Sequence, residues 1–168
     1  MAFSSIASAC VQGLHIEVIH AESDVSNGLP MFHMVGYLSS EVKEAAERVR
    51  TAIRNSGFSL PPKKIVVNLS PATVKKKGAS YDLPIALSVL EAVGNLPAKA
   101  LERVLVAGEL SGRESTRSRG SSANRSGGKG AGISHMYFAR KKYKRRASCA
   151  GDPYYRCRNI GTIVPGFK

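Results

Sequence analysis

The stretch that decides the fold is VNLSPATVKKKGASYDLPIAL, which runs from Val67 to Leu87. Its first residues have the apolar character of a buried strand, and the proline at position 71 breaks that strand. A loop with three consecutive lysines follows, and the small residues of Gly78-Ala79-Ser80 then lead into an apolar helix. The stretch therefore predicts a strand, a basic loop and a helix in direct succession.

The first two-thirds of the chain predict a small set of strands and helices around this unit. Apolar runs bounded by Gly, Pro and Asn clusters predict strands, and apolar residues at intervals of three and four predict helices. The expected strands are 3–11, 14–21, 31–35, 64–69 and 101–107, and the expected helices are 41–56 and 82–93. This order predicts an α+β fold in which the helices pack on one face of a mixed sheet.

Polar residues at the two helix starts are expected to cap them. Ser40 is the expected N-cap of the first helix and Asp82 that of the second. Pro84 fits the first turn of the second helix, because a missing N–H costs little there. Gly57 and Gly94 follow the last helical residues, and we expect them to end the two helices.

Charge divides the 168-residue chain into two parts. Residues 1–111 hold 11 Lys or Arg and 10 Asp or Glu, whereas residues 112–168 hold 14 and 2, respectively. The second part is rich in Ser, Arg and Gly without hydrophobic periodicity, so its composition predicts a basic, disordered tail. The net charge of +13 therefore gives no evidence that the folded part binds nucleic acid. Salt-dependent, nonspecific contact with nucleic acid would come from the tail, chiefly from Arg140–Arg146.

Neither the cysteines nor the histidines predict a metal site. Cys10, Cys149 and Cys157 form no pair with metal-ligand spacing, and His15 and His20 are expected on opposite faces of one strand. No run approaches the ~18 apolar residues of a membrane span, and no basic segment precedes an apolar core as in a signal peptide. We therefore expect a cytoplasmic protein with no metal and no membrane partner.

Five ordered blocks in residues 3–111 carry a resemblance to a known family. The blocks are SNGLP (Ser26–Pro30), VKEAAERVRTAIRNSGF (Val42–Phe58), VNLSPA (Val67–Ala72), GASYDLPIAL (Gly78–Leu87) and GELS (Gly108–Ser111). With these blocks the chain resembles the N-terminal domain of the YifB/ComM family of magnesium-chelatase-like AAA+ ATPases. The matching motif positions are Asn27, Gly28, Pro30, Asn68, Pro71, Gly78, Ser80, Asp82 and Pro84.

The resemblance implies a Lon-protease-like fold of the ribosomal S5 domain 2 type for residues 1–111. It also implies that this domain precedes a hexamer-forming ATPase module that uses ATP and Mg, while the present chain itself needs no cofactor. Members of the family are cytoplasmic bacterial proteins associated with DNA uptake, and their motor acts on branched DNA. The implied partners are therefore the chain's own AAA+ module, further copies in a homo-hexamer and, through the full-length protein, DNA.

The chain departs from the family plan after Ser111. The nearest run to the ATP-binding pattern GxxxxGK[ST], Gly127–Gly130, lacks its spacing and its Ser or Thr. Codons can be chosen for Ser122–Lys129, Phe138–Tyr143 and Tyr154–Thr162 that give family-like sequence when displaced by one base. We therefore expect a domain that is incomplete at its C-terminus, followed by a tail translated out of frame. Sequencing of the coding DNA tests this expectation.

Two features of the 67–87 stretch are candidates for function. Ser80 occupies the place of the nucleophile in Lon-type peptidases, but serine needs a general base, and the resemblance offers no lysine at the corresponding place. Lys75, Lys76 and Lys77 form a compact basic loop that can contact the phosphates of nucleic acid or remain a solvated loop. The expected function is a non-catalytic accessory or assembly domain of the ATPase. The alternatives are a peptidase that uses Ser80 and a basic protein that binds nucleic acid through its tail.

Overall fold

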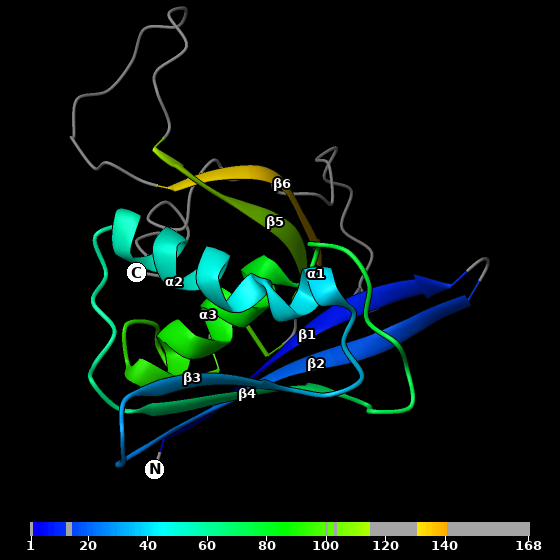
Figure 1. Ribbon diagram of the computed structural model, residues 1–168. Helices are drawn as coiled ribbons and strands as arrows, with labels where there is room; N and C mark the ends of the chain where they lie inside the picture. Colours follow the sequence, from blue (N-terminus) through cyan, green and yellow to red (C-terminus); the bar gives the residue numbers. More distant parts are fainter. Residues whose placement is uncertain (1, 13–14, 100, 103, 115–130, 141–168) are drawn as a thin grey trace, which may run out of the picture.

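The computed structural model describes residues 2–12, 15–99, 101–102, 104–114 and 131–140 (Figure 1). The strands are β1 (Ala2–Gln12), β2 (His15–Ser26), β3 (Met31–Val35), β4 (Lys64–Ser70), β5 (Val104–Glu114) and β6 (Ala131–Arg140). The helices are α1 (Ser40–Lys43), α2 (Ala45–Asn55) and α3 (Asp82–Val93). Within the described residues the strands form one mixed sheet in the order β3-β4-β2-β1-β5-β6. β3 pairs with β4 and β1 with β5 in parallel, and the other neighbours are antiparallel.

The helices cover one face of this curved sheet. α3 contacts β1, β2 and β5, and α2 packs on α3 and β5 (Figure 1). Alternate residues of the strands are buried on that face, including Ile6, Ile19 and Val67, none of which has exposed surface. Residues on the opposite face, such as Phe3 and Val18, are exposed. The α+β fold with helices on one face of a mixed sheet is therefore confirmed.

α3 is the central helix of the core, and ten of its twelve residues are buried. Its predicted bounds are correct, and Gly94 ends it in the left-handed conformation with φ 90°. The predicted cap is wrong: Tyr81 is the N-cap, and Asp82 is the first helical residue. Asp82 is fully buried, because the start of α3 lies under α2 and β5 and its side chain pairs with groups from both elements. A carboxylate at this position therefore connects three elements instead of capping one.

The expected helix 41–56 is divided into α1 and α2 at Glu44. The Glu44 carbonyl accepts hydrogen bonds from the amides of both Glu47 and Arg48, which marks a tight turn within the helical path. Ser40 is the first residue of α1, so the expected cap at Ser40 is wrong by one residue, and Ser39 is the N-cap. The Ser39 hydroxyl bonds no backbone amide of the helix.

β5 is longer than predicted and continues to Glu114, where it pairs with β6 in antiparallel register. The register shifts between Glu109 and Leu110 and again between Leu110 and Glu114. β6 lies within the segment whose composition predicts no regular structure. The other residues of the predicted tail lie outside the described residues, and the out-of-frame origin of the tail stays a prediction.

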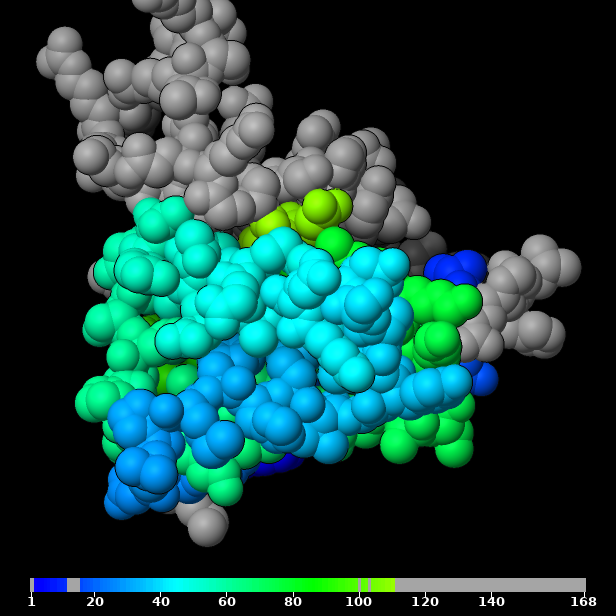
Figure 2. Space-filling view, in the orientation of Figure 1, coloured from blue at the N-terminus to red at the C-terminus, as the bar shows by residue number. Residues whose placement is uncertain are grey.

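The connections between these elements bring two loops together at one end of the sheet. β4 ends at Ser70, and the loop 71–81 returns past the segment 36–41 before α3 begins. In the space-filling view this loop, green and to the right, borders the cyan surface of α1 (Figure 2). The triple-lysine loop and the entrance to α1 therefore share one surface.

Candidate functional site

The triple-lysine loop is attached to the segment 37–39 through its middle residue. The Lys76 amide donates to the Tyr37 carbonyl at 2.9 Å, and the Ser39 amide donates to the Lys76 carbonyl at 3.0 Å. The Lys76 side chain has no exposed surface, and its Nζ donates to the Pro71 carbonyl. Burial disfavours the charged amine and lowers the pKa of Lys76. Of the three lysines in the predicted basic loop, Lys76 is therefore buried and anchors the loop, whereas Lys75 and Lys77 are exposed.

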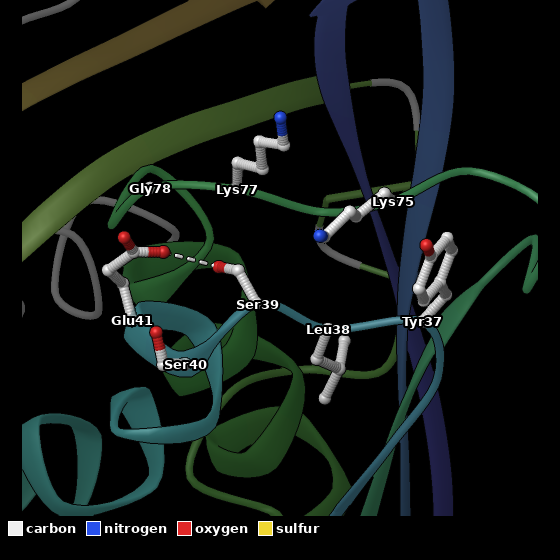
Figure 3. A pocket seen from close by; sticks show the side chains of 8 residues that line it. All are labelled: Tyr37, Leu38, Ser39, Ser40, Glu41, Lys75, Lys77 and Gly78. Atoms are coloured by element: carbon white, nitrogen blue, oxygen red, sulfur yellow. Dashed lines mark hydrogen bonds between the residues drawn. The ribbon is translucent and has the colours of Figure 1, made fainter.

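The two flanking lysines line an open pocket between the loop and the start of α1, with Lys75 extended toward Tyr37 and Ser39 and Lys77 directed away from Glu41 (Figure 3). The pocket has a volume of about 520 Å³. Its polar lining comes from two short segments: Tyr37, Ser39, Ser40, Glu41, Lys75 and Lys77. Lysine ammonium groups, hydroxyls and one aromatic ring therefore surround a single space.

The charges in the pocket act on one another. Lys75 Nζ lies 5.6 Å from the centre of the Tyr37 ring, within the range of a cation–π contact. The Ser39 hydroxyl donates to the Glu41 carboxylate at 2.5 Å. This hydrogen bond is the main reason that the pKa of Glu41 lies below its usual value, and the positive charges of Lys75 and Lys77 lower it further. An ionised Glu41 therefore shares the pocket with the two lysines and feels their positive charge.

Ser80 and Asp82 lie beside this pocket at the start of α3, but their environments differ. Ser80 is exposed, and its carbonyl accepts a hydrogen bond from the Gly108 amide at 2.8 Å. Among the described residues, no hydrogen bond involves the Ser80 hydroxyl. The Asp82 carboxylate accepts hydrogen bonds from Arg48 at 2.7 and 3.0 Å and from the Leu110 amide at 3.4 Å. Burial raises the pKa of Asp82, and its bonds to Arg48 oppose that effect.

The other motif positions lie away from this pocket or serve the fold. Asn27, Gly28 and Pro30 belong to the turn between β2 and β3, at the end of β4 opposite to the lysine loop. Asn68 on β4 donates to the Glu22 carboxylate at 2.8 Å, and Pro84 is buried in α3.

The structure does bring Pro71, Gly78 and the lysines together. Sequence reasoning missed Tyr37, Ser39 and Glu41, which precede or begin a helix and carry no motif of their own. The one available signal was an apolar strand that ends at Gly36 directly before an aromatic residue and two serines.

Two other kinds of site are absent from the part of the chain that the structure describes. No group of three or more His, Cys, Asp or Glu side chains there could hold a metal ion. None of the described helices is long and apolar enough to cross a membrane.

Comparison with known proteins identifies the family of this α+β domain. The family model of subunit ChlI of Mg-chelatase matches residues 21–122, which is more than half of the chain. The chain therefore belongs to this family.

The curated relatives extend the family assignment to particular proteins. YifB of Escherichia coli (strain K12) and YifB of Salmonella typhimurium are each 44% identical to the chain over 110 residues. Competence protein ComM of Haemophilus influenzae is 39% identical over 110 residues. Each alignment covers 66% of this chain and 22% of the relative. The chain thus spans about a fifth of the length of the curated relatives it matches, and the similarity to YifB and ComM is confirmed.

Proposed function

We propose that residues 1–111 are a non-catalytic accessory or assembly domain of a magnesium-chelatase-like AAA+ ATPase that processes DNA. The observation that carries this proposal is the alignment of the domain with about a fifth of YifB and of a protein named for competence. ATP and Mg would be used by the ATPase module and not by this chain. The partners would be that module, further copies in a hexamer and DNA.

The start of α3 supports a structural role. Asp82 is occupied by Arg48 and the Leu110 amide, so it is not available to orient a base. Ser80 is exposed at a turn, and a serine hydroxyl without a neighbouring base is a weak nucleophile at neutral pH. The contacts of both positions therefore support a structural role at the entrance of a buried helix.

A domain exchange tests the proposal. The aligned segment of Haemophilus influenzae ComM is replaced by residues 1–111, and a second variant of ComM lacks that segment. We expect the chimera to retain the oligomeric state, the ATPase rate and the transformation frequency of ComM, and the deletion to lower all three. A chimera that behaves like the deletion in all three assays would contradict an accessory or assembly role.

The peptidase alternative has its own test. A fluorophosphonate probe should leave the full chain unlabelled, because the Ser80 hydroxyl has no hydrogen bond to a base among the described residues. Labelling that Ser80→Ala abolishes, while Ser39→Ala retains it, would instead support a Ser80 peptidase.

A further inference from the structure

Lys75 and Lys77 are two exposed cations at the edge of the pocket. Among the described residues, the side chain of neither lysine forms an ion pair or a hydrogen bond. Lys76, between them, is buried, and its side chain donates a hydrogen bond to the Pro71 carbonyl. The surface Arg50, for comparison, pairs with Glu47 at 3.3 Å. Both flanking lysines line the same pocket, so their charges are available to one ligand there.

The position of these lysines is set by the backbone rather than by chance contacts. Lys76 pairs with both sides of Leu38 through its amide and its carbonyl and forms an isolated parallel bridge. Its buried side chain holds the loop from beneath at Pro71. Because Lys76 is fixed and faces the protein, its two sequence neighbours are held at the pocket. Anion binding between them therefore costs the rotamer entropy of two lysine side chains but little backbone entropy.

Tyr37 gives the pocket an aromatic wall. The side chain is 53% exposed, and Lys75 lies over its ring at 5.6 Å. Every nucleobase has a π-face that can stack on such a ring, and phosphates pair with neighbouring lysines. The geometry points to a site for a nucleotide unit, with its phosphate between Lys75 and Lys77 and its base on Tyr37. The source we infer is a single-stranded nucleic acid, and a free nucleotide has the same chemistry.

Glu41 limits the strength of this site and helps to define it. Its carboxylate lines the same pocket as the two lysines, so the pocket carries a formal charge of one positive unit, and a phosphate near Glu41 is repelled. The lysine end of the pocket is therefore the phosphate end. An acidic peptide would use the two charges, but its carboxylate side chains have no flat face to stack on the ring, and for that reason we favour a nucleotide.

The absence of tryptophan from the chain allows a site-specific assay. Tyr37→Trp places one tryptophan in the wall of the pocket, and a base that stacks on it quenches its fluorescence. The full chain is titrated with an oligothymidylate of about eight nucleotides, the order of one single-strand binding site. Binding elsewhere, including to residues 112–168, adds no such signal.

Three further variants are made in this background. Lys75→Gln with Lys77→Gln removes both proposed phosphate contacts, and Glu41→Gln removes the repulsion. Lys63→Gln with Lys64→Gln removes equal charge from the opposite end of β4 and is the matched control. The first double variant should weaken binding about tenfold and reduce the salt slope by about 0.7, the value for one phosphate on a single strand. Glu41→Gln should strengthen binding, and the control should change it less than twofold.

The outcomes separate the sources of the ligand. Saturable quenching that depends on Lys75 and Lys77 and is much weaker with thymidine monophosphate supports a strand site. Equal affinity for the mononucleotide supports the same pocket with a free nucleotide as its ligand. Absence of quenching, quenching that the lysine double variant leaves unchanged, or equal competition by polyglutamate would overturn the proposal. The inference stands independently of the ATPase assignment, because the assay uses this chain alone.

Discussion

Replacement of Arg48 by methionine should destabilise the fold strongly. The Asp82 side chain is 1% exposed, and Arg48 Nε and its neighbouring nitrogen bind it at 2.7 and 3.0 Å. Without the guanidinium, the carboxylate retains only the Leu110 amide at 3.4 Å. Loss of one partner of a buried ion pair costs about 3–5 kcal/mol. Because the Arg48 side chain is 28% exposed and water can replace part of it, we expect a loss of about 3 kcal/mol in the free energy of unfolding.

Urea unfolding followed by circular dichroism measures this loss. Arg50→Met is the matched control, because Arg50 has the same chemistry two residues further along α2 and pairs with the exposed Glu47. Such surface pairs contribute at most about 1 kcal/mol. Equal losses for Arg48→Met and Arg50→Met would refute the reasoning, since they would show that the buried pair adds nothing beyond a surface contact.

The pH dependence of the same variant gives a second, independent check. Burial raises the pKa of Asp82, and removal of Arg48 should raise it further because the opposing positive charge is gone. A raised carboxyl pKa favours the protonated folded state, so the loss caused by Arg48→Met should be smaller at about pH 5 than at about pH 8. A loss that grows as the pH falls would contradict this assignment.

Three further changes test other contacts. Burial lowers the pKa of Lys76, so the folded protein favours the neutral amine. The free energy of unfolding of the wild type, measured in urea, should therefore rise relative to that of Lys76→Met as the pH approaches the usual lysine pKa of about 10.4. A difference that does not change with pH would contradict this. Gly36 has φ 129°, and an added Cβ would lie 2.9 Å from the Leu69 carbonyl oxygen. Gly36→Ala should therefore cost about 2 kcal/mol or more, and an unchanged melting temperature would disprove the strain. The buried Ser8 hydroxyl has no hydrogen-bond partner among the described atoms. Ser8→Ala should therefore leave the free energy of unfolding in urea unchanged or raise it by about 1 kcal/mol. A clear loss of stability would show that the hydroxyl has a partner.

The sequence predicted best the elements whose signals are local. α3 was placed correctly because a long apolar run follows a turn and ends at Gly94, which adopts the left-handed conformation that glycine favours. β4 was placed nearly as well, since its alternating apolar residues end at Pro71. Both predictions depend on residues within one element, and such signals survive in any tertiary context.

The failures concern residues whose role is set by a distant partner. Asp82 at a helix start has the pattern of a cap, and only Arg48, 34 positions earlier, makes it a buried ion-pair partner. Lys76 has the pattern of a solvated charge, but the carbonyl of Pro71 and the backbone of Tyr37 bury it. For the same reason, the sequence predicted only the lysine side of the pocket. Its lysines form a visible run, whereas Tyr37 joins them through tertiary pairing.

The two buried contacts that sequence reasoning missed also explain why the pocket keeps its shape. The segment 36–48 and the segment 71–82 are joined at one place by the backbone bonds of Lys76 and at another by the pair of Arg48 and Asp82. The Arg48 side chain also donates to the Glu41 carbonyl at 2.9 Å, so the second joint holds a residue of the pocket itself. Arg48→Met should therefore weaken the quenching of a tryptophan at position 37 under conditions where the protein remains folded. If the variant binds oligothymidylate as tightly as its parent, the loop anchor alone defines the pocket and the ion pair serves stability only.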